Sequence, residues 1–222
     1  MRRFLPFVTD HYYHIFNRSV NKQPIFLQRP NYQRFIDIIR FYKVAKPPCR
    51  FSRFLDLPQR DQIAVIEALA LAKPSVSVLT YCIMPNHFHL LVRQEQDRGI
   101  SNMVSVIQNS YAKYFNIKYG RVGAFWQGPF KAVLVEDDEQ LLHVSRYIHL
   151  NPYTSDIIQR KEEIFTYPWS SIGEYVGTKE GEFCRKEEIV SHYRSPEEYA
   201  EFIRDRADYQ KRLKEIEYLF LE

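Results

Sequence analysis

The segment that most constrains the fold is a predicted β-hairpin over residues 76–92, VSVLTYCIMPNHFHLLV. Its two halves are short runs rich in β-branched, aromatic and aliphatic side chains, and Met84-Pro85-Asn86 between them is a turn signal. Successive side chains of a strand point to opposite faces, so His87 and His89 share one face. The apolar residues that alternate with them share the other face, which should pack on helices. The hairpin therefore predicts two imidazoles side by side on a rigid strand.

The segments before the hairpin predict one strand and one helix. Residues 11–17, HYYHIFN, have the aromatic content of a strand. Asn31 is expected to cap a helix over about residues 32–45, because Phe35 and the apolar residues after it recur at helical spacing. Pro47-Pro48 should end that helix.

The segments after the hairpin predict a second helix over about residues 100–118 and a fourth strand over residues 130–135. Asp137 or Asp138 should then cap a further helix, which Asn151-Pro152 should terminate near Leu150. The resulting order of strands and helices predicts an α+β chain. Its first six elements match a ferredoxin-like split β-α-β sandwich, and the seventh is an extra helix.

Two regions fall outside this frame. Residues 49–74 read as an insertion, a basic stretch followed by a short helix. Residues 153–222 are charged and mostly helical in pattern. We therefore expect a domain over residues 1–152 that contains the insertion, and a helical C-terminal extension over residues 153–222.

Composition excludes several classes of protein. The 222 residues are 45% hydrophobic and 26% charged, as in ordinary soluble globular proteins. No apolar run is long enough to cross a bilayer and no signal peptide is seen, so we expect a cytoplasmic protein without a membrane partner. The three cysteines are far apart and form no Cys-x-x-Cys pair, so neither a disulfide framework nor a cysteine zinc site is expected.

The net charge of +4 conceals an asymmetry that indicates a polyanionic partner. Residues 1–135 hold 19 Lys and Arg against 7 Asp and Glu, whereas residues 136–222 hold 12 against 20. Aromatic residues, 15% of the chain, interleave with the basic ones in the first part. That mixture suits single-stranded nucleic acid, because cations contact phosphates and rings stack on bases. Candidate DNA contacts are Arg18, Lys113, Lys118, Arg121, Trp126 and Lys131.

The histidine pair and one helix carry the candidate chemistry. His87 and His89 are suited to share a divalent metal ion, although two ordinary strand histidines would have the same spacing. In the helix over residues 138–150, Gln140, His143, Tyr147 and Asn151 form one polar stripe. A tyrosine and an amide four residues apart share a helix face, and a tyrosine can act as a nucleophile when a metal or a base assists it. The alternative is that Tyr147 is one of 16 tyrosines with a structural role.

Two further features each allow two interpretations. The acidic run Glu136-Asp137-Asp138-Glu139 could hold a second metal, but acids at a helix start complement its dipole, and that interpretation is favoured. His14, on the first strand, fits either a place near the site or a packing role.

His87-Phe88-His89 after Met-Pro-Asn, with Tyr147-Ile148-His149-Leu150-Asn151-Pro152 further on, resembles the HUH-type tyrosine transposases. The resemblance is strongest to the REP-associated tyrosine transposases among the IS200-like transposases, and it runs in the same order from about residue 11 to residue 177. It implies a ferredoxin-like domain that binds single-stranded or hairpin DNA. It further implies attack of Tyr147 on a backbone phosphate, leaving a 5′-phosphotyrosine, with His87, His89 and Asn151 as ligands of Mg²⁺ or Mn²⁺.

Three functions therefore compete. The first is a single-strand DNA transposase or nickase; the second is a domesticated, non-catalytic protein that recognises hairpin DNA. The third is a zinc hydrolase built on His-x-His, against which the lack of a third His or carboxylate at motif spacing weighs. The recognised DNA sequence, the physiological metal and the choice between monomer and homodimer stay open.

Overall fold

The computed structural model describes residues 6–179 and 183–212, and its core is a four-stranded antiparallel sheet. The strands are β1 (Tyr12–Arg18), β2 (Val76–Met84), β3 (His87–Gln94) and β4 (Lys131–Val135). They lie in the order β2-β3-β1-β4, which is the order of a ferredoxin-like sandwich. The predicted α+β class and the predicted hairpin are confirmed.

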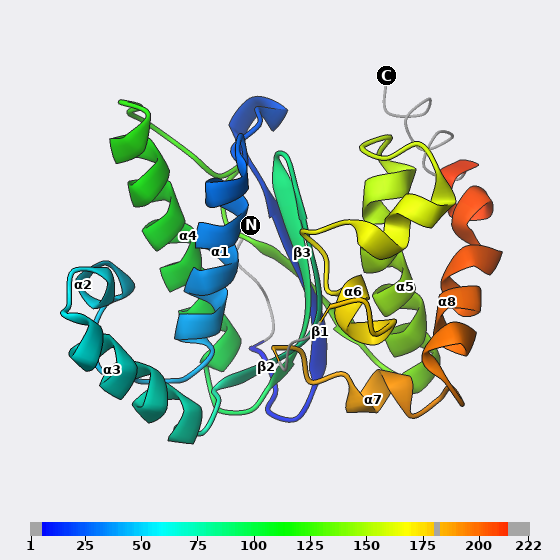
Figure 1. The fold of residues 1–222 in the computed structure, drawn as a ribbon, viewed down its shortest axis with the longest axis horizontal. Helices are drawn as coiled ribbons and strands as arrows, with labels where there is room; N and C mark the ends of the chain where they lie inside the picture. Colours follow the sequence, from blue (N-terminus) through cyan, green and yellow to red (C-terminus); the bar gives the residue numbers. More distant parts are fainter. Residues whose placement is uncertain (1–5, 180–182, 213–222) are drawn as a thin grey trace.

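Helices cover both faces of the sheet (Figure 1). One face packs on α1 (Arg29–Tyr42) and α4 (Gly99–Lys118), as the split β-α-β pattern requires. Phe88 of β3 points to this side, where its ring lies 5.1 Å from that of Phe35. The opposite face packs on α5 (Asp138–Thr154), the extra helix of the prediction. Because both faces are covered, β2 and nearly all of β3 are buried.

The insertion and the C-terminal extension are helical, as expected. The insertion forms α2 (Phe51–Leu55) and α3 (Gln59–Leu71), which lie outside α1 and α4 in Figure 1. The extension contains the 3-10 helix η2 (Lys161–Thr166) and the short α-helix α6 (Ile172–Tyr175). These are followed by α7 (Glu187–Val190) and α8 (Pro196–Asp205). Residues 180–182 and 213–222 of the expected extension lie outside the described residues. The division at residue 152 stays a prediction.

Two predicted helix boundaries are wrong. Asn31 does not cap α1: the N-cap is Gln28, whose backbone N–H donates to the Asn31 side chain 3.1 Å away. Pro30 fits the first turn of the helix, because the missing N–H of proline is not needed there, so the helix starts earlier.

The second error concerns the end of α5, which continues through Asn151-Pro152 to Thr154. Proline removes one backbone hydrogen bond from the last turn. Pro152, Tyr153 and Thr154 are nevertheless buried, and this packing stabilises the helix beyond the point where proline would end an exposed one. The acidic run behaves as favoured: Asp137 is the N-cap and accepts a 2.7 Å hydrogen bond from the Gln140 N–H.

The extension covers the free edge of β2. The Ile83 N–H donates to the Trp169 carbonyl at 2.8 Å, and the Tyr81 carbonyl accepts from the Ser171 N–H at 3.0 Å. The Tyr175 hydroxyl donates to the Leu79 carbonyl at 2.9 Å. An uncovered edge would leave these backbone groups open to pairing with another chain.

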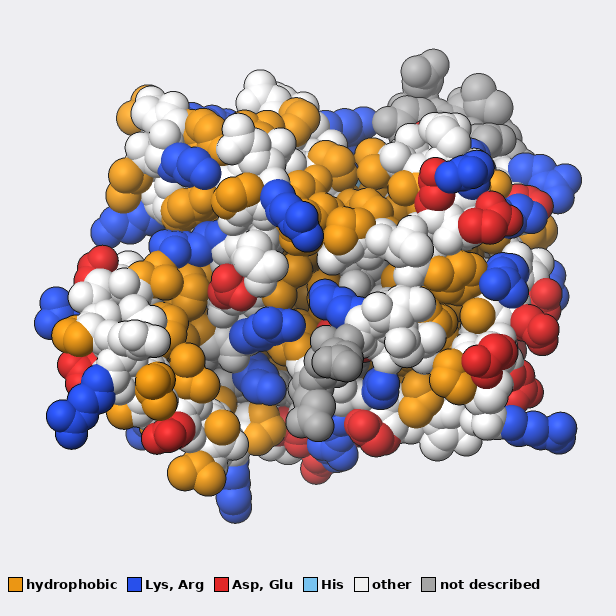
Figure 2. All heavy atoms as spheres, viewed as in Figure 1, with side chains coloured by type: hydrophobic (Ala, Val, Ile, Leu, Met, Phe, Trp, Pro, Cys, Tyr) orange, Lys and Arg blue, Asp and Glu red, His pale blue; other side chains and the backbone are white. Residues whose placement is uncertain are grey.

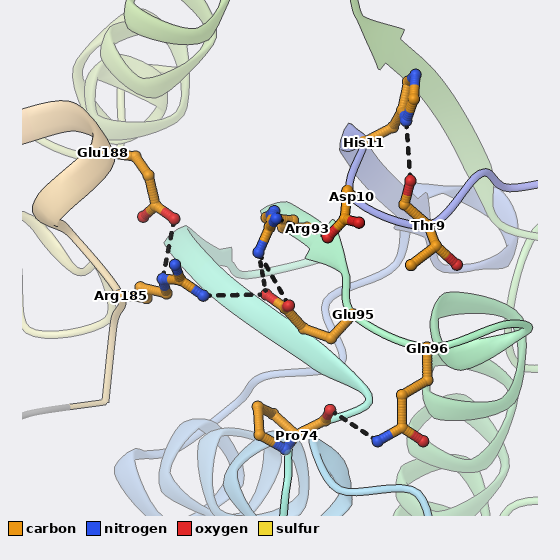
Figure 3. Close-up of polar contacts among 9 residues, drawn as sticks. All are labelled: Thr9, Asp10, His11, Pro74, Arg93, Glu95, Gln96, Arg185 and Glu188. Carbon is orange, nitrogen blue, oxygen red and sulfur yellow. Dashed lines mark hydrogen bonds and ion pairs between the residues drawn. The ribbon is translucent and has the colours of Figure 1, made fainter.

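A group of ion pairs fastens the same extension to the end of the sheet (Figure 3). Arg93 of β3 bonds Asp10 at 2.6 Å and Glu95 at 2.9 Å. Arg185 of the extension reaches Glu95 at 3.3 Å and Glu188 at 2.9 Å. Shared partners make this a network rather than isolated surface pairs, which individually contribute little.

His149 fastens α5 to the extension from inside. Its ring is fully buried, with Nδ1 2.8 Å from the Tyr199 hydroxyl and Nε2 2.7 Å from the Ser171 hydroxyl. Burial lowers the pKa of His149 to about 3. An unfolded histidine has a pKa of about 6.5, so at pH values below this the unfolded chain binds a proton at His149 that the folded chain does not bind.

This pKa predicts acid-dependent stability. Stability is fully present above pH ~6.5 and falls as the pH drops toward ~3, by up to ~1.4 kcal/mol per pH unit for one proton. Urea denaturation at several pH values measures the slope. His149→Gln should be destabilised at pH 7 by about 1–3 kcal/mol, since a buried hydroxyl loses its partner. Its pH slope should be shallower; an unchanged slope would contradict the assignment.

Candidate active site

The site is built on the sheet face beneath α5. In the β1–β3 pairing Phe16 lies opposite His89 and Arg18 opposite His87. On the other side of β1, Phe16 lies opposite Lys131 of β4. Residues directly opposite in an antiparallel pair share a face. The two histidines therefore stand in one row of side chains that crosses three strands.

Tyr147 of α5 lies over this row. Its ring is 5.7 Å from the His89 ring, edge to face at 87°, and 5.7 Å from the ring of His14. The His87 and His89 rings are 5.1 Å apart. Both histidines are buried, at 7% and 6% exposure, whereas Tyr147 is 38% exposed. A partly open tyrosine above two buried imidazoles can be reached by a polymer from solvent.

These side chains line a pocket of about 230 Å³. Its wall combines the predicted histidines, tyrosine and amide with the basic side chains of Arg18 and Lys131. The remaining lining residues are Phe16, Asn17 and Gln127. Of the predicted DNA contacts, Arg18 and Lys131 are thus brought to the site, and the others lie elsewhere.

The polar stripe of α5 divides into two parts. Tyr147 and Asn151 line the pocket together, one helical turn apart. Asn151 is fully buried, and its amide donates to the Tyr147 carbonyl at 3.1 Å. His143 lies away from the pocket, where it contacts Glu139 at 3.9 Å and the ring of Phe202.

The outer ring nitrogens of both strand histidines are held by neighbours. His87 Nδ1 lies 2.6 Å from Asn86 Oδ1, and His89 Nδ1 lies 2.9 Å from His14 Nε2. Burial lowers the pKa of His14 to about 4, so its ring is neutral near pH 7 and its Nε2 is able to accept a hydrogen bond from the Nδ1–H of His89. Metal-ligating histidines are commonly held in this way through the second nitrogen.

The donor set fits a divalent ion. Two imidazoles and an amide oxygen on one pocket wall match the mixed nitrogen and oxygen ligation that Mg²⁺, Mn²⁺ and Zn²⁺ accept. No group of three or more His, Cys, Asp or Glu able to hold a metal occurs in the described part of the chain. Any metal here would therefore need the Asn151 amide, water or substrate to complete its ligands.

The sequence left the place of His14 open and did not single out Gln127. His14 lies at the site, where its ring shares a hydrogen bond with His89. Gln127 reaches the pocket from the α4–β4 loop through a hydrogen bond of its N–H to the Arg18 carbonyl at 2.8 Å. Neither position had a motif to mark it.

Trp126, a predicted DNA contact, is only partly exposed. Its indole is half-buried, packs against Phe35, Phe88 and Tyr111, and donates its N–H to the Gln108 carbonyl at 3.1 Å. The ring thus packs on the hydrophobic core on the α4 side of the sheet. Its contact with DNA stays a prediction.

Comparisons with known proteins agree with this fold. Residues 49–151 match the family model of IS200-like transposases, a stretch that contains His87, His89, Tyr147 and Asn151. No curated protein matches the sequence. None of the helices in the described residues is long and apolar enough to cross a membrane.

Solved structures also match this chain. A REP-associated tyrosine transposase bound to a REP hairpin is 16% identical, with a TM-score of 0.54 over 82% of this chain and 93% of that chain. A candidate transposase from Deinococcus radiodurans R1 is 14% identical, with a TM-score of 0.36 over 67% of this chain and 95% of that one. At such identities the first likeness shows a shared fold. The match to the IS200-like transposase model extends over the strand with the paired histidines and the helix with the tyrosine, so this part of the chain is similar to that family.

Proposed function

We propose that this protein is a transposase that cuts and rejoins single-stranded DNA next to a hairpin, with Tyr147 as its nucleophile. The observation that carries the proposal is the pocket itself, in which a partly exposed tyrosine from α5 lies over two histidines of β3 beside Arg18 and Lys131. The structural relative that was solved with a REP hairpin supports hairpin DNA as the substrate.

The chemistry follows from the groups in the pocket. The Tyr147 oxygen attacks a backbone phosphorus, the bond from phosphorus to the 3′-oxygen breaks, and a 5′-phosphotyrosine and a free 3′-hydroxyl remain. The phenol loses its proton and the 3′-oxygen gains one. The number of phosphoester bonds is conserved, so attack by another 3′-hydroxyl can rejoin the strand. Arg18 and Lys131 would hold the phosphates on either side.

A divalent ion would be ligated by His87 and His89 through Nε2 and by the Asn151 side-chain oxygen. When bound it would polarise the scissile phosphate and favour the phenolate, since a phenol with a pKa near 10 is a weak nucleophile at neutral pH. The Nδ1 contacts of both histidines to Asn86 and His14 fix the rings in the orientation that such ligation needs.

A non-catalytic DNA-binding role is the second candidate. The extension and the buried network around His149 would serve binding equally well. What favours the enzyme is the convergence of the complete set of reactive side chains on one pocket. A protein that only binds DNA has no need for a tyrosine edge-on to a buried histidine.

Replacing the nucleophile tests the proposal directly. Tyr147→Phe should abolish the covalent adduct with a labelled hairpin oligonucleotide while leaving DNA affinity within about twofold, because only a hydroxyl is removed. Adduct is measured on a denaturing gel. Tyr153→Phe is the matched control: the Tyr153 hydroxyl donates to Asp208 at 2.9 Å, so this variant should still form adduct. Adduct in the Tyr147→Phe variant would overturn the assignment.

Metal binding can be measured without activity. Isothermal titration with Mn²⁺ should show one site in the wild type and a loss of affinity of at least about tenfold in His87→Ala, His89→Ala and the double variant. His11→Ala, which changes an exposed histidine bonded to the Thr9 carbonyl, is the control and should bind as the wild type does. Equal affinity in the wild type and the double variant would remove the metal site from the account.

Substrate class is tested by competition. A hairpin with a single-stranded flank should bind more tightly than a fully paired duplex of equal length, because a flexible strand can enter the pocket and a stiff duplex must first deform. Affinity should fall steeply with salt, as release of counterions from phosphates requires. Equal affinities, or a flat response to salt, would show that the substrate class is wrong.

A further inference from the structure

Two long segments of the chain that contribute to the pocket end of the molecule contain no carboxylate side chains. Residues 11–36 and 98–135 contain no Asp or Glu, yet they hold nine Lys and Arg. They form β1, the start of α1, α4, the α4–β4 loop and β4. In Figure 2 the upper left part of the surface, over the end of α4, shows blue side chains without red ones.

The α4–β4 loop presents an apolar residue at the edge of this surface. Gly120 and Gly123 have φ of 61° and 98°, values that L side chains rarely adopt, so the chain turns sharply on either side of Arg121 and Val122. Val122 is 90% exposed, and Ile117 in the last turn of α4 is 73% exposed. The turn therefore holds Val122 away from the body of the protein.

The cations around these two residues are partnered by neutral groups. Lys118 lies 5.5 Å from the Tyr114 ring and donates to its hydroxyl at 3.2 Å. Arg121 lies over the Phe125 ring and donates to the Ala124 carbonyl at 3.3 Å. Lys113 is exposed one turn before Ile117. In the part of the chain described, none of the three forms an ion pair with a carboxylate, so their charge is directed to solvent.

The loop connects this surface to the pocket. Gln127 lines the pocket and is bonded to the Arg18 carbonyl, and Ser19 pairs with Trp126 as an isolated bridge. Val122 is five residues before Gln127, so the two are separated by at most about 18 Å of extended chain. That span corresponds to about five nucleotides at the spacing of a stacked B-form strand, and to fewer in an extended single strand.

A single exposed valine on a protein surface needs no explanation. This one is held between two left-handed glycines, beside a second exposed aliphatic side chain and three cations, within a few nucleotides of the pocket. The charge of that surface is complementary to a phosphate backbone, and aliphatic side chains are used by DNA-binding proteins to contact or separate base faces.

We propose that residues 117–122 form a second DNA contact, at which an unpaired base of the single-stranded flank lies against Val122 and Ile117. Lys113, Lys118 and Arg121 hold the phosphates on either side of that base. The proposal rests on the function proposed above and adds to it a position for the flank: the strand leaves the pocket along the α4–β4 loop.

Binding of two fluorescent hairpins, one with a single-stranded 5′ flank and one without, tests the contact. Val122→Ser should weaken binding of the flanked hairpin about fivefold, which corresponds to about 1 kcal/mol, and leave the unflanked hairpin unchanged. Leu71→Ser is the matched control, because Leu71 is 89% exposed on α3, which lies at the lower end of the molecule in Figure 1, away from the α4–β4 loop; it should leave both affinities unchanged. Lys118→Gln should lower the dependence of log affinity on log salt by about 0.7–0.9.

The outcomes separate this contact from the proposed function. If the wild type binds the flanked hairpin and Val122→Ser binds it equally well, the second contact is wrong and the pocket stands. Equal weakening by Leu71→Ser, or equal weakening of both hairpins by Val122→Ser, would also overturn it. If the wild type binds neither hairpin, the proposed function fails and this contact fails with it.

Discussion

The register between β1 and β3 is the constraint on which the site depends. It sets Arg18 opposite His87 and Phe16 opposite His89, so that the histidine pair lies inside a row of side chains that reaches Lys131. A slip of one residue would turn the whole row to the other face of the sheet. That other face is filled by Phe88 and the rings of α1 and α4, which makes the slipped arrangement costly. The hydrophobic packing of one face thus determines the polar chemistry of the other.

The second requirement is that α5 stays in place over the row. Tyr147 faces the pocket, and His149, two residues on, points to the other side of the helix into the C-terminal extension. There it contacts Ser171 and Tyr199 with both ring nitrogens. The extension is in turn bonded along β2 and fastened by the ion pairs around Glu95. The acidic C-terminal part of the chain therefore supports α5, while the basic first part supplies the cations that line the pocket.

Much of this could be predicted from the sequence because the signals are local. The hairpin, the order of the elements and the shared face of His87 and His89 follow from short-range periodicity. The end of α5 could not be predicted: a proline rule holds for exposed helices, and the burial of Pro152 and Tyr153 is a tertiary effect. His14 and Gln127 join the site through strand pairing and a loop contact, which no spacing in the sequence reveals. The packing of Trp126 on the core could not be predicted for the same reason, since its contacts come from residues far away in the chain.

The central claim is that one pocket unites a metal ion, a phosphate and the side chain at position 147. The most direct test is anomalous diffraction from crystals of the Tyr147→Phe variant grown with Mn²⁺ and a flanked DNA hairpin. The account predicts a single strong anomalous peak bonded to His87 and His89, with a backbone phosphate between that peak and the ring at position 147. A peak at the acidic residues 136–139, or DNA bound away from the pocket with no phosphate beside the histidines, would contradict it.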